Sequence, residues 1–459
     1  MMPNANGNIT LDQFDENILP MKGSDDKNHS NFSDPAFSRN KSYPIHRWVP
    51  WIAGFSKEFV NDSIMKYVDG SGTILEPFAG VGTTLVEALL TGNDAYGFEI
   101  NPYAAFACRT KLNSYTVGES ELREEIEGFF KFYKSAIQSN YVPKSSAPVG
   151  FKTRIEFYSP KVLAKVLIVQ DYIKGIEVRS IQDLFRLAFA STMVKYSNYS
   201  YEPSLGTRIG SGKKNIEDFE VGETVIQKLV EYLKDISWVK RIVNTQHPPC
   251  IEVINDSFFE YKSHLPKDSI DLIITSPPYL NNYHYNRNTR PQLYWLDFVN
   301  SPKDLKPLEN NNFGNFWQTV RDKEGMCLIF NADFIDLEER LDKIRSVNPD
   351  KKTYGGNGWA NYAISYFNDC YLFSQGIKHC LKRDATALVV IGNSILQGVA
   401  IPTDEYFGKI AESIGLELVE IHVPRSKRVG NSIIQSDVRV SKAKKGHRLY
   451  EAVVELRKL

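Results

Sequence analysis

The sequence contains no long hydrophobic run. No uninterrupted apolar stretch approaches the roughly 18 residues that cross a bilayer. The first residues also lack the apolar core of a secretory signal. We therefore expect a protein that has no membrane partner and that works in the cytoplasm.

Cysteine is scarce, and the charge is balanced. The five cysteines, at positions 108, 250, 327, 370 and 380, are odd in number and lack the paired CxxC spacing of metal sites. This usage predicts reduced thiols and no metal site. The 55 basic and 55 acidic side chains give a formal net charge of zero, so no overall positive field indicates a nucleic-acid partner. Any such partner must be bound by a local basic patch.

The chain is long and apolar enough for a large core. It has 459 residues, 42% of them hydrophobic, which suggests two or more structural units. Residues 1–40 are rich in Asn, Asp and Ser and are expected to be flexible. From 113 to 247, apolar residues at helical spacing and the helix-opening pair Ser159-Pro160 predict a mostly helical insertion. Strands and helices alternate on both sides of it, which predicts an open α/β sheet with insertions.

A glycine turn in "EPFAGVGTT" joins a short strand at 74–75 to a helix at about 83–90. Gly80 and Gly82 let the backbone approach a ligand and turn tightly into the helix. Glu99 ends the next strand, where a carboxylate can accept hydrogen bonds from both ribose hydroxyls of a nucleoside. The pattern predicts a site for a nucleoside cofactor, and a purely structural turn is the alternative.

Two common phosphate-binding patterns are absent from this turn. The third glycine of the dinucleotide pattern GxGxxG falls at Leu85, and no GKS or GKT follows the glycines. A turn that binds a nucleoside without holding a pyrophosphate suits S-adenosylmethionine.

A second motif lies in "DLIITSPPYLNNYHY". A buried strand at 271–274 runs directly into Ser276-Pro277-Pro278-Tyr279. Prolines end strand pairing because they lack the N–H and fix φ. An ordinary loop with an accidental proline pair is the alternative. Because ligands of open α/β sheets bind at the carboxyl edge, the motif predicts a site there.

Together the two motifs resemble those of the amino-group DNA methyltransferases, which modify the exocyclic amine of cytosine or adenine. The SPPY form resembles the cytosine-N4 branch, and adenine N6 stays open. The resemblance implies a Rossmann-like class I methyltransferase fold, S-adenosylmethionine as cofactor and double-stranded DNA as substrate. It also implies site-specific action in a restriction–modification system, with a possible cognate restriction endonuclease. The matching segments are Phe78-Ala79-Gly80-Val81-Gly82, Glu99-Ile100-Asn101-Pro102 and Ser276-Pro277-Pro278-Tyr279.

The resemblance gives each residue of the tetrapeptide a role. An exocyclic amine is a poor nucleophile because its lone pair is delocalised into the ring. The oxygen of Ser276 and the carbonyl of Pro277 would accept the two amine hydrogens and favour a tetrahedral nitrogen. Pro278 would hold these acceptors still. Tyr279 would stack on a base that has left the double helix.

The resemblance also implies a set of cofactor contacts. Asp256 matches the acidic position that hydrogen-bonds the adenine amine of the cofactor, and a simple cap is the alternative. The segment "HRWVPWIAGFS" would bind the methionine end of the cofactor through His46, Trp48 or Phe55, and packing of these residues in the core is the alternative. The expected cofactor-binding residues are Glu76, Phe78, Gly80, Gly82, Glu99, Asn101, Asp256 and His46.

Basic residues in two places are candidates for DNA contact. The stretch 422–448 is rich in Lys and Arg and has one acid, Asp437, although such a run is usually a solvated face. Aromatic and basic residues also follow the tetrapeptide. The candidates are Arg287, Arg290, Arg425, Lys427 and Arg428. Asn393 and Ser394, after a later strand, are candidates for the pocket wall, and a plain turn is the alternative.

The expected organisation has six parts. In chain order, they are a flexible segment (1–40), a cofactor-binding part (41–112), a helical insertion with a possible role in target recognition (113–247), a catalytic part (248–300), a polar insertion with possible DNA contact (301–369) and a C-terminal part with a basic loop (370–459).

Three rival functions have weaker signals. An RNA guanine or amine methyltransferase would share the order of the motifs, but it usually carries Asp in place of Ser276. Methylation at cytosine C5 needs a cysteine nucleophile, yet Cys250 of the pair Pro249-Cys250 begins a strand pattern and is expected to be a strand entry. A non-enzymatic DNA-binding protein would have no use for the tetrapeptide.

Overall fold

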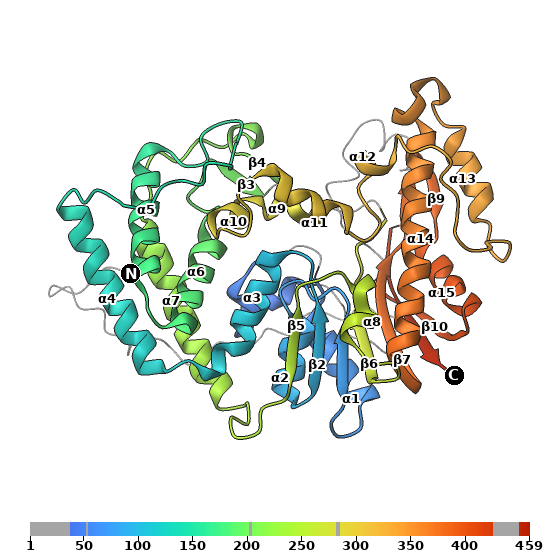
Figure 1. Cartoon of the computed structure of the whole chain (residues 1–459), viewed down its shortest axis with the longest axis horizontal. Helices are drawn as coiled ribbons and strands as arrows, with labels where there is room; N and C mark the ends of the chain where they lie inside the picture. Colours follow the sequence, from blue (N-terminus) through green and yellow to red (C-terminus); the bar gives the residue numbers. More distant parts are fainter. Residues whose placement is uncertain (1–36, 52–53, 202–203, 281–284, 426–448) are drawn as a thin grey trace.

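A seven-stranded, mostly parallel sheet forms the centre of the molecule (Figure 1). The computed structural model describes residues 37–51, 54–201, 204–280, 285–425 and 449–459, so most of the segment expected to be flexible lies outside the described residues. In spatial order, the strands are β10 (Leu416–Arg425), β11 (Glu451–Lys458), β7 (Leu381–Gly392), β6 (Ile270–Thr275), β1 (Thr73–Glu76), β2 (Asp94–Phe98) and β5 (Ile251–Ile254). The five strands from β7 to β5 are parallel to one another, and β11 runs antiparallel to both of its neighbours, β7 and β10.

Successive residues of the central strands face opposite sides of the sheet, and both sides are apolar. Ile74 packs into one hydrophobic cluster, while its neighbour Leu75 packs into another. The same alternation separates Leu272 and Ile274 from Ile273 in β6. A parallel sheet buried on both faces needs a helical layer on each side.

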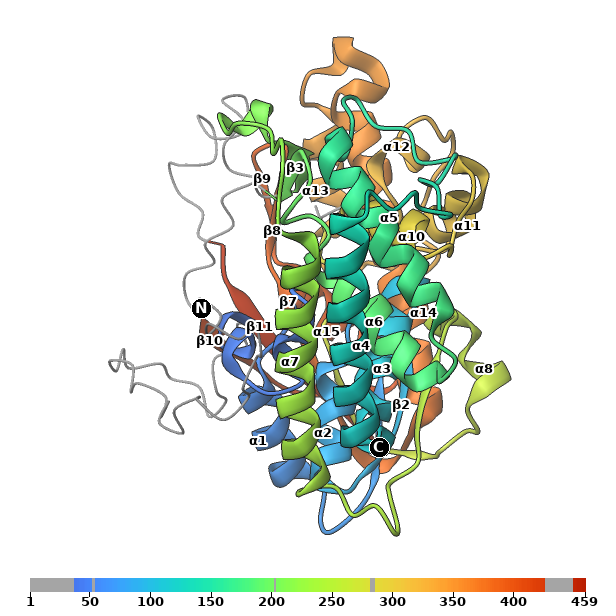
Figure 2. The ribbon, with the colours of Figure 1, turned by 90° about the vertical axis from the view of Figure 1, so that its left-hand side faces the viewer.

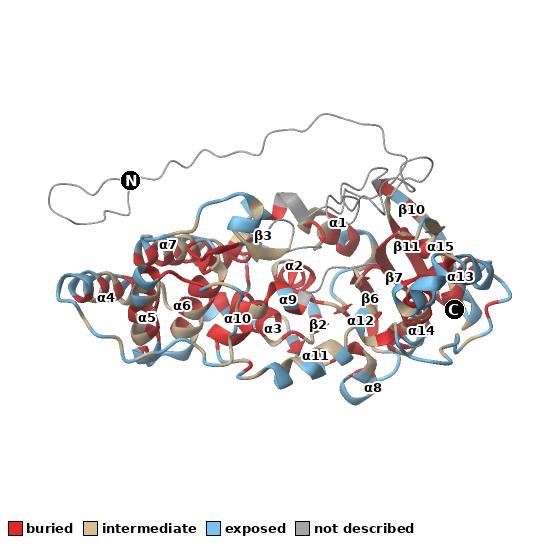
Figure 3. Cartoon of the chain, turned by 90° about the horizontal axis from the view of Figure 1, so that it is seen from above, coloured by how far each residue is buried: buried red, intermediate tan, exposed pale blue. Residues whose placement is uncertain are grey.

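Both helical layers are present. The helices that cover the first face are α1 (Lys57–Tyr67), α2 (Thr83–Thr91) and α3 (Pro102–Leu112), and those on the second face are α14 (Gly356–Cys380) and α15 (Thr403–Ser413). Figure 3 shows buried residues concentrated along the sheet and on the inner sides of these helices. The predicted Rossmann-like methyltransferase fold, an open sheet with a helical insertion, is confirmed.

The helical insertion packs beside the first face of the sheet and shares its hydrophobic cluster (Figures 1 and 2). The predicted helix opening at Ser159-Pro160 is confirmed, because α5 (Pro160–Gly175) begins at Pro160. The hydroxyl of Ser159 donates to the carbonyl of Glu217 instead of capping the helix. A short hairpin of β3 (Tyr199–Tyr201) and β4 (Leu205–Thr207) was not predicted. The long helices are α4 (Glu119–Gln138), α5 (Pro160–Gly175), α6 (Arg179–Thr192) and α7 (Val221–Lys240).

The polar stretch after residue 300 contains more helix than its composition suggests. Its Gly- and Asn-rich end, from Gly356, forms the first turns of α14, within the stretch 301–369 expected to be a polar insertion. Residues with weak helix propensity are helical here because Ala360, Ala363 and Phe367 are fully buried in the second cluster. The shorter elements are η2 (His46–Trp48), α8 (Tyr261–His264), α9 (Tyr285–Asn288), α10 (Arg290–Trp295), α11 (Lys306–Asn310), α12 (Trp317–Val320), α13 (Leu337–Arg345), β8 (Ser394–Leu396) and β9 (Val399–Ile401).

The described part of the chain has neither a membrane-spanning helix nor a group of side chains arranged as a metal site. None of its helices combines the length and the apolarity that crossing a bilayer requires. Within the same residues, no group of three or more His, Cys, Asp or Glu side chains is arranged to hold a metal ion.

Candidate active site

A pocket opens at the carboxyl ends of β1, β2, β5 and β6, and both sequence motifs contribute to its wall. Gly80 follows β1, Glu99 follows β2, and Ser276 and Pro278 follow β6. Parallel strands bring these distant segments together because their carboxyl ends meet at one edge of the sheet. The full lining comprises Trp51, Pro77, Phe78, Gly80, Phe98, Glu99, Ile100, Asn101, Asp256, Ser257, Phe258, Phe259, Ser276, Pro278, Asn286, Asn311, Asn312 and Phe313.

The two glycines of the turn have different neighbours. Gly80 has a φ of +52°, and a Cβ there would lie 2.9 Å from Nε1 of Trp51, beside the pocket. Gly82 begins α2 with a φ of +86°, and a Cβ there would lie 2.3 Å from Sγ of Cys108. Gly80 therefore keeps the pocket wall open, whereas Gly82, which is not part of the lining, lets α2 and α3 pack closely.

Glu99 holds the glycine turn through its carboxylate. Oε2 accepts the backbone N–H of Gly80 at 2.8 Å, and Oε1 accepts that of Asn101 at 2.7 Å. Burial raises the pKa of this carboxyl from 4.5 to about 7, although the two N–H groups favour the ionised form. A carboxylate has about four acceptor positions. Glu99 thus keeps acceptor capacity for a ligand in the pocket.

Glu76 lies beneath the turn instead of lining the pocket. It is 1% exposed, and it accepts the backbone N–H of Phe78 at 3.0 Å and the hydroxyl of Thr84 at 2.8 Å. Burial raises its pKa to about 7. Phe78 itself lines the pocket, edge-on to the ring of Phe313. Glu76 shapes the turn from behind, and its predicted contact with the cofactor stays a prediction.

Asn101 connects the part of the pocket next to the glycine turn to the segment after the tetrapeptide. Its Oδ1 caps α3 by accepting the backbone N–H of Tyr103 at 3.1 Å, so its amide nitrogen points away from the helix. That nitrogen donates to Thr289 at 2.8 Å and to Oδ1 of Asn286 at 3.4 Å. The amide nitrogen of Asn286 is buried and has no hydrogen-bond partner among the described residues, and Asn286 lines the pocket. It can donate to a ligand.

Asp256 lies in the pocket wall after β5, and the contact with the cofactor that the resemblance implies for it stays a prediction. Its side chain is 43% exposed, it accepts the backbone N–H of Ser257 at 2.7 Å, and it pairs with Nε2 of His264 at 3.1 Å. The cap of the following turn is Ser257, whose hydroxyl accepts the backbone N–H of Phe259 at 3.3 Å, so Asp256 itself does not occupy the cap position.

Two residues of the tetrapeptide take part in a short series of hydrogen bonds at the carboxyl end of β6. Ser276 donates to the hydroxyl of Tyr279 at 3.3 Å, and Tyr279 donates to Oε1 of Glu451 at 3.4 Å. Tyr279 is only 8% exposed and packs into the second hydrophobic cluster. Ser394 donates to the carbonyl of Leu280 at 2.8 Å and so supports the loop that follows the tetrapeptide. Asn393, its neighbour, accepts the backbone N–H of Tyr450.

The segment expected to bind the methionine end reaches the pocket through a residue that was not predicted. His46 is buried, bonds to Oε1 of Glu87 at 2.8 Å, and has a pKa lowered by burial. Trp48 is fully buried, and Phe55 packs edge-on against Phe59. His46, Trp48 and Phe55 are absent from the lining, whereas Trp51 is part of it. Trp51 belongs to the same aromatic segment, "HRWVPWIAGFS", so the sequence signal pointed to the right segment but not to this residue.

Residues of the polar insertion were also missed. Asn311, Asn312 and Phe313 follow α11 and line the pocket, where the ring of Phe313 is edge-on to Phe78 of the glycine turn. Nothing in their spacing indicates this position, because the packing of Phe313 on residues far away in the sequence determines it. Phe313 is edge-on to Tyr366 of α14, with ring centres 5.4 Å apart.

The candidate DNA-binding residues are described only in part. Arg287 is exposed on α9, whereas the guanidinium of Arg290 lies over the rings of Phe151 and Tyr294, at 5.8 and 5.7 Å. Arg425 ends β10, and Lys427 and Arg428 lie outside the described residues.

The cysteine of the rival C5 chemistry lies at the wrong edge of the sheet. Cys250 precedes β5, and its backbone N–H donates to Asp94 at the start of β2, at 2.7 Å. The pocket lies at the other end of these strands. Cys250 is therefore a strand entry, as expected.

The chain is similar to three Type II methyltransferases. It is 24% identical over 438 residues to M.BsoBI of Geobacillus stearothermophilus, covering 86% of this chain and 83% of the relative. M.AvaI of Anabaena variabilis is 25% identical over 420 residues, which cover 86% and 84%. M.MvaI of Kocuria varians is 24% identical over 344 residues, 72% of each chain. No protein-family model matches this chain.

A solved structure, the rRNA methyltransferase aviRa from Streptomyces viridochromogenes, superposes with a TM-score of 0.29 at 8% identity, covering 91% of this chain and 92% of that chain. A score this low supports no argument about function. The methyltransferase fold described above rests on the order and direction of the strands.

Proposed function

We propose that this chain is a site-specific DNA methyltransferase that transfers a methyl group from S-adenosylmethionine to N4 of cytosine. The observation that carries the proposal is the shared pocket, whose wall includes Gly80 and Glu99 as well as Ser276 and Pro278. A donor of methyl groups and an acceptor amine must meet in one cavity for direct transfer, and these two segments supply one wall for each.

The residues on the cofactor side fit S-adenosylmethionine. Glu99 keeps acceptor positions for two ribose hydroxyls, and Asp256 offers a half-exposed carboxylate to an adenine amine. Gly80 leaves room beside the indole of Trp51. The cofactor supplies an activated methyl group, and the protein binds and orients it.

On the acceptor side, the chain would hold the amine in a reactive geometry. Ser276 and the carbonyl of Pro277 accept the two amine hydrogens, so that the nitrogen lone pair is directed at the methyl group. The prolines fix φ and offer no competing donor. The resemblance would have the ring of Tyr279 stack on a base that has left the duplex. In this structure the ring is buried in the second hydrophobic cluster and lies outside the pocket lining. The methyl group would pass directly from the sulfonium sulfur of the cofactor to the amine nitrogen. S-adenosylhomocysteine would leave, the nitrogen would lose one proton, and no cysteine takes part.

The similar proteins support the class of reaction. All three are Type II methyltransferases, and the aligned regions span most of both chains. Action on double-stranded DNA next to a cognate restriction endonuclease follows for this chain as part of the proposal. Adenine N6 is the second candidate for the same amine chemistry, and an RNA amine is the third.

The test is incubation of the purified protein with labelled S-adenosylmethionine and double-stranded DNA of mixed sequence, followed by mass analysis of the nucleosides. We expect 4-methylcytosine. A product of 6-methyladenine would move the activity to the second candidate. Label transferred to RNA and not to DNA would overturn the proposal.

A further inference from the structure

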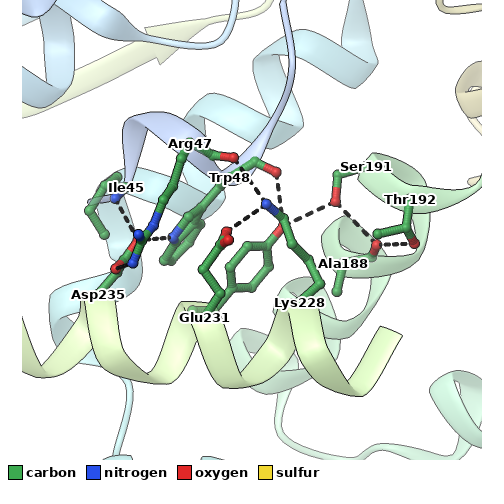
Figure 4. Close-up of polar contacts among 10 residues, drawn as sticks. Ile45, Arg47, Trp48, Ala188, Ser191, Thr192, Lys228, Glu231 and Asp235 are labelled. Atoms are coloured by element: carbon green, nitrogen blue, oxygen red, sulfur yellow. Dashed lines mark hydrogen bonds and ion pairs between the residues drawn. The ribbon is translucent and has the colours of Figure 1, made fainter. Parts of the chain in front are cut away.

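A buried carboxylate of the helical insertion holds the segment that leads into the pocket. Asp235 of α7 is 2% exposed, and its two oxygens accept four hydrogen bonds from residues 45–48 (Figure 4). Oδ2 accepts the backbone N–H of Ile45 at 2.9 Å, Nε of Arg47 at 3.1 Å and Nε1 of Trp48 at 2.9 Å. Oδ1 accepts Nη2 of Arg47 at 2.5 Å. Four donors converge on one side chain that is far away in the sequence.

The backbone that this carboxylate holds is strained. Ile45 has a φ of +63°, a conformation that a β-branched residue rarely adopts. Such a conformation persists when its surroundings over-determine it. Here the hydrogen bond from the N–H of Ile45 to Asp235 helps to hold Ile45 in this conformation.

Further contacts fix the same segment from both sides. Lys228 donates to the carbonyl of Arg47 at 2.9 Å (Figure 4). The ring of Tyr232 stacks on Trp48 with ring centres 4.0 Å apart. On the opposite side, His46 bonds to Glu87 of α2, the helix that follows the glycine turn. The segment thus bridges the helical insertion and the cofactor side of the sheet.

The chain between this anchor and the pocket is short and stiff. Val49 is extended and 2% exposed, Pro50 has a fixed φ, and Trp51 follows directly in the wall of the pocket. Three residues span at most about 10 Å. A displacement of Trp48 is therefore passed on to Trp51, and hence to the space above Gly80.

We propose that Asp235 is a positioning residue for cofactor binding, acting through Trp51. The inference rests on the proposed function, because it takes the pocket to be the cofactor site. It gives the helical insertion a second role, since the insertion then supports one wall of the cofactor pocket in addition to any contact with the target.

An asparagine at position 235 has nearly the same size as the native aspartate, but it cannot accept all four of these hydrogen bonds. Its single amide oxygen can replace one carboxylate oxygen, and its NH₂ group then faces a donor from Arg47 or Trp48. Asp235→Asn should release the segment without opening a cavity. Asp183→Asn is the matched control, since Asp183 makes surface ion pairs on α6 of the same insertion with Arg179 and Arg186, away from residues 45–48.

The experiment is calorimetric titration of S-adenosylmethionine, without DNA, into the wild type and into Asp235→Asn, Asp183→Asn, Trp51→Ala and the double variant Asp235→Asn with Trp51→Ala. We expect Asp235→Asn to weaken binding about tenfold, a change of about 1.4 kcal/mol, and Asp183→Asn to leave it unchanged. In the Trp51→Ala background, Asp235→Asn should have no further effect, because the two act through one contact. A general loss of stability would weaken binding equally in both backgrounds.

Unchanged affinity in a folded Asp235→Asn variant, or an equal loss in both backgrounds, would overturn the inference. If Asp235→Asn does not fold, Trp48→Phe decides in its place, because it removes one donor and keeps the stacked ring: binding as tight as in the wild type rejects the inference. Absence of binding to the wild type would instead reject the proposed function, on which the inference rests.

Discussion

Gly80 donates its backbone N–H to Oε2 of Glu99 at 2.8 Å, which ties the turn after β1 to the end of β2. The carboxylate that shapes the turn is thus the one expected to bind the ribose. Its other oxygen is held by the N–H of Asn101. Because both oxygens are oriented by backbone groups, their remaining acceptor positions have a defined direction.

This relationship makes cofactor binding depend on pH. Burial raises the pKa of Glu99 to about 7, so the group gains a proton as the pH falls through that value and loses acceptor capacity. We expect the affinity for S-adenosylmethionine to fall by up to about tenfold for each pH unit below 7. Calorimetry between pH 5.5 and 8 measures this. Glu99→Gln should bind weakly at every pH, and a flat profile for the wild type would contradict the role of Glu99.

A matched pair of variants can show whether Gly80 has a role in cofactor binding beyond that of an ordinary turn glycine. Gly80 and Gly92, at the two ends of the α2 region, both have positive φ, but a Cβ on Gly92 meets nothing within 4 Å in the described part of the chain. Gly80→Ala and Gly92→Ala should each lose about 1–2 kcal/mol of stability through the backbone. Only Gly80→Ala should also weaken cofactor binding, because its methyl group approaches Nε1 of Trp51. Equal affinities in the two variants would argue against a cofactor at this turn.

Gly82 should matter for stability instead. A Cβ there would lie 2.3 Å from Sγ of Cys108, in a conformation with a φ of +86°. We expect Gly82→Ala to lower the free energy of unfolding by about 3 kcal/mol or more, as overpacking adds to backbone strain. Adding Cys108→Ala removes the sulfur and should recover about 1–2 kcal/mol, a coupling typical of residues in contact. Urea unfolding of the four proteins measures it, and strict additivity would show that the two residues do not clash.

The elements around both motifs could be predicted from the sequence because their signals are local. The strand at 73–76, the helix at 83–91 and the strand ending at Thr275 all follow from apolar runs next to Gly or Pro. Parallel pairing then brings the motifs to one edge. The walls of the pocket could not be predicted in this way. Trp51 and Asn286 reach it only because distant groups, Asp235 and Asn101, hold their segments.

The same limit explains why the sequence analysis names His46 and not Trp51. Both belong to one aromatic segment, and its sequence does not reveal which ring turns inward. The choice depends on Glu87, which binds His46 behind the pocket, and on the contacts of Trp48 with α7. These partners lie 41 or more positions away in the chain, so no spacing rule connects them.

The chemistry of the tetrapeptide can be tested apart from cofactor binding. Ser276→Ala removes one acceptor for the amine and leaves the glycine turn untouched, so methyl transfer should fall by about 10²–10³-fold while the affinity for S-adenosylmethionine stays the same. Tyr279→Ala should also abolish transfer, and it leaves a cavity in the second hydrophobic cluster. Tyr279→Phe keeps the ring and removes only the bonds to Ser276 and Glu451. It should therefore retain far more activity than Tyr279→Ala if the ring stacks on the base. Single-turnover transfer of a labelled methyl group to DNA gives the rates, and near-normal turnover in Ser276→Ala would remove the proposed mechanism.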